Sequence, residues 1–284
     1  MVKQNGSFFG RLFKKIFLLS LFALFGVGGY LAWQHRDNLP SALDFGLAED
    51  SITTFELAYS PEQIMQKHKS ELLRTSEHSF GKAYVQFVPL LLMNVKYTQD
   101  NKTTQEAECL WNLQTGEMIL DTSSFETTHG FEDCINSKAS QDDFRILHAI
   151  LRKGGSITKE QLAQELGLDS DELSSRLEVL RKKHLIVQKL ETITLHFQNP
   201  RLLVVPRTKI SQSFVQKVVA SGSQASARYS KDEIQKVAKA AFGQDFAIRS
   251  AQEVYVPIVG LEVCNPDGST LKVFYNGITS KKLL

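Results

Sequence analysis

The sequence predicts an α+β protein with one transmembrane helix near its N-terminus, followed by a central helical domain between two similar helix-plus-hairpin modules. Three observations lead to this prediction. Residues 16–33 form an uncharged apolar run, residues 59–122 and 229–284 share a pattern, and residues 140–197 show helical periodicity with turn signals.

The apolar run at residues 16–33 follows a basic N-terminal flank. At ~1.5 Å per residue it reaches ~27 Å, close to the ~30 Å hydrocarbon core of a bilayer. We therefore expect residues 1–36 to form a basic cytoplasmic stub and a single-pass anchor whose partner is the lipid bilayer. The positive flank predicts a cytoplasmic N-terminus and an extracytoplasmic body at the inner membrane of a bacterium. Cleavage as a signal peptide remains the alternative.

The net charge and the cysteine count limit the classes of function that residues 37–284 can have. The net charge of the whole chain is +2 and that of the first 36 residues is +5, so the remaining 248 residues have a net charge of −3. A mildly acidic body argues against a broad nucleic-acid surface. The odd count of three cysteines gives no disulfide framework, although one bridge between Cys109 and Cys134 stays open beside the expectation of buried thiols.

An internal repeat relates the first and last modules. Each copy opens with a capping signal, Ser60 with Gln63 and then Ser230 with Glu233, which predicts a helix start. Two apolar strands joined by a polar turn follow in each copy, Leu90–Tyr97 with Ala107–Leu113 in the first and Ile258–Cys264 with Thr270–Tyr275 in the second. The matched segments are Tyr59–Ile64 with Tyr229–Ile234, Val88-Pro89 with Val256-Pro257, and Asn112–Gly116 with Asn276–Ser280. Residues 37–58 and 198–228 are expected to be linkers.

The turn Asn112-Leu-Gln-Thr-Gly-Glu117 after a helix and a hairpin resembles the "D-x-x-T-G-E" pattern of the PepSY family. Asn112 stands where that family has an acid. In the second copy Asn276 takes this place and Ser280 replaces the glycine. The resemblance implies extracytoplasmic or membrane-linked modules that act in inhibition or protein binding and not in catalysis.

The middle module has the pattern of a helix, a helix-turn-helix and two short strands. Apolar residues recur at helical spacing in residues 142–153, and Thr158 and Asp169 are helix caps for the next two helices. Residues 186–189 and 192–195 then predict two strands. This order resembles the winged-helix superfamily over residues 140–197.

The outer face of the third helix in this module decides between DNA and protein as its partner. If the leucines of that helix point inward, Asp171, Ser175, Glu178 and Lys182 point outward. Residues 140–190 carry nine Lys/Arg and eight Asp/Glu, a poor electrostatic footprint for phosphates. The sequence therefore predicts a protein contact at these four residues and argues against DNA.

The predicted function is that of a membrane-anchored adaptor or assembly protein without catalysis, cofactor or metal. The open edges of the hairpins offer a second partner surface, assigned to Leu271 and Val273. His129 and Cys134 form only half of a metal site and have no third group to make a catalytic set. The alternative is a membrane-tethered winged-helix transcription regulator whose flanking modules sense a signal.

Overall fold

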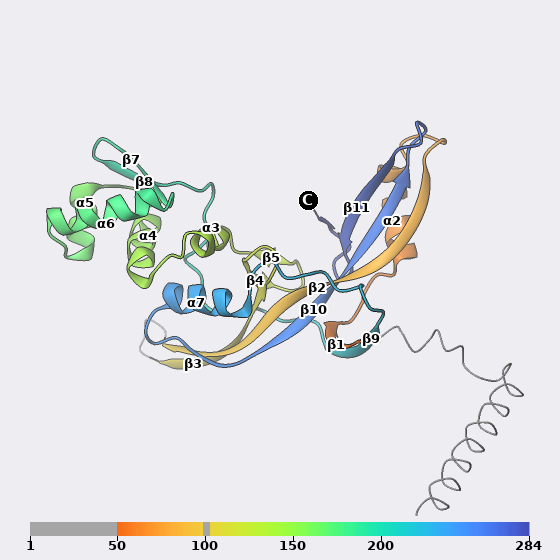
Figure 1. Ribbon diagram of the computed structural model, residues 1–284, viewed down its shortest axis with the longest axis horizontal. Helices are drawn as coiled ribbons and strands as arrows, with labels where there is room; N and C mark the ends of the chain where they lie inside the picture. Colours follow the sequence, from red (N-terminus) through yellow and green to blue (C-terminus); the bar gives the residue numbers. More distant parts are fainter. Residues whose placement is uncertain (1–49, 99–102, 284) are drawn as a thin grey trace, which may run out of the picture. The chain divides into compact units, whose positions relative to one another are not determined.

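The computed structural model describes residues 50–98 and 103–283 of the chain. These residues form a mixed α/β arrangement around one large sheet (Figure 1). The strands of the large sheet are β1 (Asp50–Phe55), β2 (Ser79–Thr98), β3 (Thr104–Asn112), β4 (Met118–Asp121), β5 (Glu126–Thr127), β9 (Phe214–Val219), β10 (Ala247–Cys264), β11 (Thr270–Asn276) and β12 (Lys282–Leu283).

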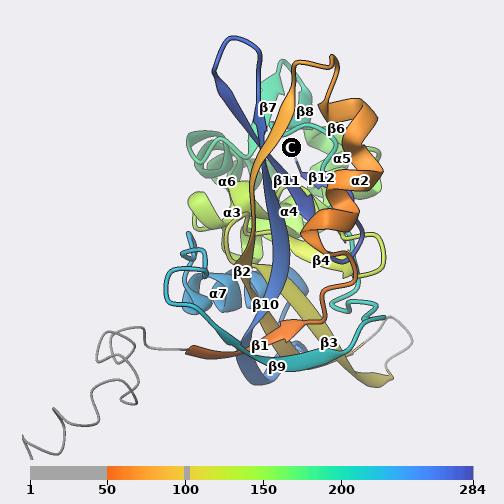
Figure 2. The same ribbon diagram turned by 90° about the vertical axis from the view of Figure 1, so that its right-hand side faces the viewer.

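The centre of the sheet is the antiparallel pair β2 and β10, which run side by side over almost their whole length. Val88 lies opposite Val256, so the two Val-Pro segments meet at the midpoint of the pair. The hairpin β2–β3 extends from one end of this pair and the hairpin β10–β11 from the other (Figure 2). The two copies of the repeat are therefore related by an approximate twofold axis between Val88 and Val256.

Each helix of the repeat packs on the hairpin of the other copy. Ile64 of α2 (Pro61–Leu72) shares a buried cluster with Val259 and Val273, which lie on β10 and β11 of the second copy. Ile234 of α7 (Lys231–Phe242) shares another cluster with Leu91 of the first copy. The exchange creates two composite units, named here the α2 lobe (α2, β11, β12 and the adjoining parts of β2 and β10) and the α7 lobe (α7, β3, β4 and the adjoining parts of the same strands).

Equivalent hydrogen bonds hold the two helix starts. The N–H groups of Ala58 and Tyr59 donate to the carbonyl of Gly277, at 3.0 and 2.9 Å. Those of Arg228 and Tyr229 donate to the carbonyl of Leu113, at 3.0 and 2.9 Å. Reciprocal capping boxes satisfy the first turn of each helix, as their Ser-x-x-Gln and Ser-x-x-Glu sequences predict. The two lobes thus share local geometry as well as sequence.

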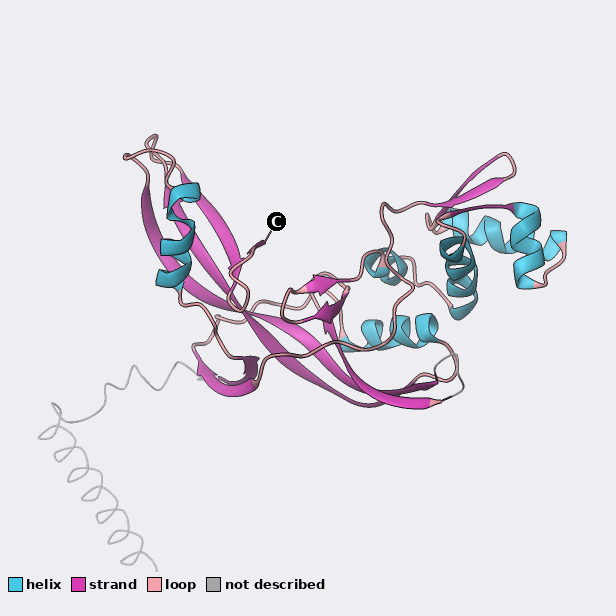
Figure 3. Cartoon of the chain, turned by 180° about the vertical axis from the view of Figure 1, so that it is seen from behind, coloured by secondary structure: helices cyan, strands magenta, loops and turns pink. Residues whose placement is uncertain are grey.

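The segment between the two copies carries a helical domain (Figure 3). Its core contains Phe144, Leu147 and Leu177 and is continuous with the core of the α7 lobe. The elements of this segment are α3 (Phe131–Asn136), α4 (Gln141–Arg152), β6 (Ser156–Thr158), α5 (Lys159–Leu166), α6 (Ser170–Lys182), β7 (Ile186–Lys189) and β8 (Thr192–Leu195). The three short strands form an antiparallel sheet in the order β6-β8-β7.

The predicted fold class is wrong. The α+β prediction had two separate helix-plus-hairpin modules flanking a central domain, whereas β2, β3, β10 and β11 belong to one sheet. That sheet is mixed, because β1 pairs in parallel with β10 while the other pairs are antiparallel. The physical reason is strand length: β2 and β10 have 20 and 18 residues, and the parts not predicted as strand pair the two copies.

The expected classification as a single-pass membrane protein is also corrected. Within residues 50–98 and 103–283, no helix combines the length and apolar character needed to cross a bilayer. The predicted span at residues 16–33 lies outside the described residues.

Two segments expected to be linkers contain structure. Residues 37–58 include β1, and residues 198–228 include β9, which pairs with β1 in antiparallel fashion. Phe55 and Phe214 stack with ring centroids 4.4 Å apart at the end of this pair. The two connections therefore add an arm to the central sheet beside β10.

Candidate protein-binding surfaces

The outer face of α6 presents the residues predicted for a partner. Asp171, Ser175, Glu178 and Lys182 are all exposed, because Leu173, Leu177 and Leu180 on the opposite face are buried. The side-chain carboxylate of Asp169 caps the helix by accepting from the N–H groups of Asp171 and Glu172. The leucine spacing thus sets the orientation of the whole helix, and the four residues share one surface.

Charge on this face is largely paired within the helix. The ammonium group of Lys182 lies 2.8 Å from Glu178, and Arg176 lies 2.7 Å from Glu172. Lys182 and its neighbour Arg181 lower the pKa of Glu178, chiefly through the hydrogen bond from Lys182. This face therefore carries both signs of charge, with Asp171 exposed beside the paired groups.

Two apolar side chains of this helical domain are exposed to solvent. Val179 is 46% exposed and lies beside Glu178, and Leu190 is 94% exposed at the tip between β7 and β8. Sequence reasoning missed both as surface residues. A valine at an outward position of an otherwise polar helix was the available signal for Val179. Apolar groups within a polar rim are typical of a protein contact.

The second predicted surface, on β11, is divided by the structure. Leu271 is 52% exposed, whereas Val273 is 4% exposed and belongs to the core under α2. Both side chains point to the same face of the strand, but α2 covers only the inner end of it. Leu271 is therefore available to a partner and Val273 is not. The β11 surface and the α6 face come from different elements and are not brought together as one contiguous set.

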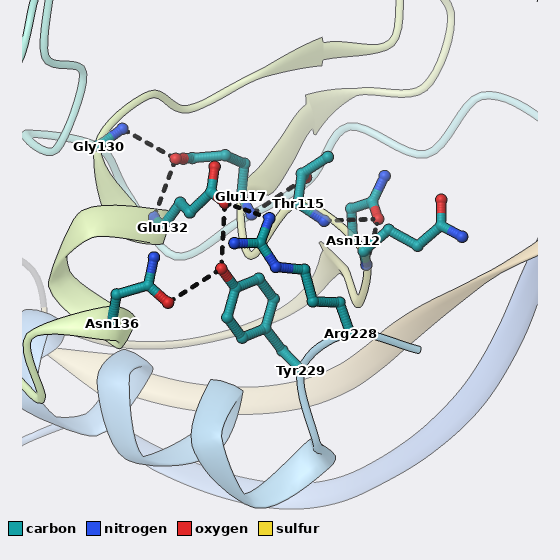
Figure 4. A network of polar contacts seen from close by, with 9 residues as sticks. Asn112, Thr115, Glu117, Gly130, Glu132, Asn136, Arg228 and Tyr229 are labelled. Atoms are coloured by element: carbon teal, nitrogen blue, oxygen red, sulfur yellow. Dashed lines mark hydrogen bonds and ion pairs between the residues drawn. The ribbon is translucent and has the colours of Figure 1, made fainter. Parts of the chain in front are cut away.

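A network of polar contacts surrounds the turn between β3 and β4 (Figure 4). The buried carboxylate of Glu117 accepts hydrogen bonds from the hydroxyl of Thr128 at 2.6 Å and from the N–H groups of Gly130 at 2.9 Å and Glu132 at 3.1 Å. The hydroxyl of Tyr229 lies 3.1 Å from a carboxylate oxygen of Glu132 and 3.1 Å from the amide oxygen of Asn136, and its one proton is available to either acceptor. These contacts fasten α3 and the start of α7 to the turn, which is a structural role.

Two of the three cysteines are buried. Cys109, Cys134 and Cys264 are free, so the bridge left open between Cys109 and Cys134 is not formed. Burial raises the pKa of Cys109 to about 12, and burial with nearby carboxylates raises that of Cys134. His129 is exposed. Among the described residues no cluster of three or more His, Cys, Asp or Glu could hold a metal ion.

A buried hydroxyl in the expected linker 198–228 was also missed. Thr208 is 5% exposed and lies at the fork between β3 and β4. Its hydroxyl accepts from the N–H of Leu110 at 2.8 Å and donates to the carbonyl of Ile119 at 2.5 Å. No periodicity marks this contact in the sequence, because a single residue makes it.

Comparisons with known protein families, curated proteins and solved structures give no match to this chain.

Proposed function

We propose that this protein is a non-catalytic adaptor or assembly component that binds another protein through the outer face of α6. The main support for the proposal is the mixture of charged and apolar side chains exposed on that face. It combines exposed acids at Asp171 and Glu178, a lysine paired within the helix, and the exposed valine at 179. This combination suits the polar rim and apolar centre of a protein interface better than a phosphate backbone.

The proposal includes a winged-helix identity for residues 140–197. Its support is the order α4, β6, α5, α6, β7, β8, with β6 and β7 both pairing antiparallel to β8. It also includes the PepSY-like reading of the two copies. The turn at Asn112 supports that reading, because its side-chain oxygen accepts from the N–H groups of Gln114 and Thr115.

Site-specific photo-cross-linking in the native cell tests the α6 surface. A photoreactive residue at Val179 should give a discrete adduct with one protein. The double variant Asp171→Lys/Glu178→Lys should abolish that adduct. The matched control Asp232→Lys/Asp245→Lys makes the same charge change at exposed positions away from α6 and should retain it. Equal adduct yield in both double variants would contradict the proposal.

A DNA-binding assay separates this proposal from the transcription-regulator alternative. Fluorescence anisotropy with a labelled random duplex should show no salt-dependent binding between about 50 and 200 mM salt. Submicromolar binding that weakens steeply over this range and disappears in Lys182→Glu would favour the alternative.

A further inference from the structure

Among the described residues, part of the outer edge of β11 has no paired strand. Asn276 donates its N–H to the carbonyl of Lys281, on the side of β12, at 2.9 Å. Residues two apart on a strand direct their N–H and C=O groups to the same side, so Lys272 and Thr270 face this side too. β12 pairs only with Phe274 and Tyr275, so in the described part of the chain residues 270–273 pair with β10 alone.

The equivalent edge in the α7 lobe is occupied. Thr208 donates its N–H to the carbonyl of Glu108 at 2.8 Å, on the open side of β3. Lys209 donates its N–H to Leu120, and its carbonyl accepts from the N–H of Thr122, at 2.9 and 3.0 Å. Residues 207–211 therefore lie as an extended segment along the fork of β3 and β4, where they satisfy backbone groups of both strands.

The two edges correspond residue by residue. Leu110 pairs with Ile119 in the α7 lobe, and Phe274 pairs with Leu283 in the α2 lobe. Both pairs lie two residues before an asparagine that donates its N–H across the turn that follows. Lys272 is therefore the counterpart of Glu108. The α7 lobe shows what the α2 lobe is shaped to receive, which is an extended chain.

The charges along the two edges indicate the charge of a segment that would bind the open edge of β11. The occupied edge carries Glu108 and Asp121, and the segment on it is basic, with Lys209 lying 3.2 Å from Asp121. The open edge has the opposite sign, because Lys272 and Lys282 have side chains 61% and 47% exposed. Their ion pairs with Glu262 and Glu71 are both long, at 3.7 Å, and surface pairs of this kind contribute little. Leu271 adds an exposed apolar contact at the same edge.

We propose that the outer edge of β11 binds an extended acidic segment of a partner protein as an added strand. Main-chain hydrogen bonds to Lys272 supply the pairing, and Lys272 with Lys282 select the negative charge. This inference rests on the proposed function only in that the partner is a protein, since it uses a surface other than α6.

A synthetic peptide based on residues 205–213 provides the probe. The acidic probe has the sequence Val-Pro-Glu-Thr-Glu-Ile-Ser-Gln-Ser, and the native basic sequence Val-Pro-Arg-Thr-Lys-Ile-Ser-Gln-Ser is its control. Titrated into the ¹⁵N-labelled full chain, the acidic probe should shift the amide resonances of Thr270, Lys272 and Phe274. The basic peptide should bind at least ten-fold more weakly. Equal binding of the two peptides would overturn the charge assignment and with it the proposal.

Two variants at one position separate backbone pairing from charge. Lys272→Ala removes the charge and keeps the N–H, whereas Lys272→Pro removes both, and proline is tolerated where an edge N–H faces solvent. The proline variant should bind the acidic probe at least ten-fold more weakly than the alanine variant. Equal affinities would overturn strand addition.

A pair of N-methylated peptides makes the same test without altering the protein. An added strand uses alternate amides, so methylation of one residue should abolish binding and methylation of its neighbour should not. Equal effects would overturn the proposal. Shifts confined to residues 171–182 would overturn it as well, while leaving the α6 function standing. Loss of the cross-link at Val179 together with intact binding at β11 would overturn the α6 function and leave the β11 proposal standing.

Discussion

Thr208→Val isolates the hydroxyl that joins β3, β4 and the segment at 207–211. Valine keeps the shape of threonine and removes only the hydrogen-bonding group. The N–H of Leu110 and the carbonyl of Ile119, both buried, then lose the partner that bridges them. Leaving a buried polar group unpaired costs about 1–3 kcal/mol, and two such groups lead us to expect a loss of about 2–4 kcal/mol in the free energy of unfolding.

Thr208→Ser is the matched control, because it keeps the hydroxyl and loses one methyl group. Burial of a carbon of this kind is worth about 0.8 kcal/mol, so the serine variant should lose about 1 kcal/mol. Urea unfolding, followed by the fluorescence of the buried Trp111 in the α7 lobe, measures both changes in the free energy of unfolding. Faster amide exchange at Leu110 in the valine variant would localise the defect. If valine and serine cost the same, the bridging role of the hydroxyl is refuted.

Four further substitutions test other parts of the fold. Gly116→Ala should lower the free energy of unfolding by about 2–4 kcal/mol, because φ is +73° and a Cβ would lie 2.7 Å from Ile135. Gly155→Ala has φ +87° but open space around it, so it should lose only the backbone strain of about 1–2 kcal/mol. Chemical denaturation measures both changes. Glu117→Gln should lower the free energy of unfolding by about 1–3 kcal/mol in the same assay, because an amide nitrogen cannot accept hydrogen bonds from the donors around it. An unchanged denaturation midpoint would contradict a stabilising role for the network at this turn. Burial lowers the pKa of His148 from 6.5 to about 4, so the unfolded chain binds the proton first, and stability should fall as pH drops from about 6.5 to about 4. His148→Phe should flatten this part of the stability–pH curve, and an unaltered slope would contradict the assignment.

Local signals in the sequence predicted several features that the structure contains. Serine and threonine caps with Gln or Glu three residues later mark the starts of α2, α5 and α7, and each forms a reciprocal capping box. The leucine spacing of α6 predicted which side chains are exposed on it. These features depend on residues within one or two helical turns, so a local pattern carries enough information to predict them.

The pairing of the two copies could not be predicted in this way, and the prolines explain why. Pro89 and Pro257 stand directly before Leu90 and Ile258, where the predicted strands begin, and proline removes a donor from a sheet. In the structure the strands β2 and β10 run through them. The carbonyls of Pro89 and Pro257 accept from the N–H groups of Leu113 and Gly277, on the side where the neighbouring strand has just turned away. The missing N–H faces that same side, where the ladder has already ended, so each strand loses little by having a proline there.

The two lobes have a common design and differ at the outer edge of their hairpins. The continuous pair β2–β10 gives both lobes the same backbone framework, and each lobe completes it with the helix of the other copy. What then distinguishes the lobes is the material added at the open edge. In the α7 lobe the segment at 207–211 satisfies the free groups of β3 from within the chain. In the α2 lobe the corresponding groups on β11 have no such segment among the described residues, and Lys272 stands where the occupied edge has Glu108. A shared framework with one filled edge and one open edge of opposite charge is the arrangement expected of a protein that uses one copy for its own stability and the other for binding.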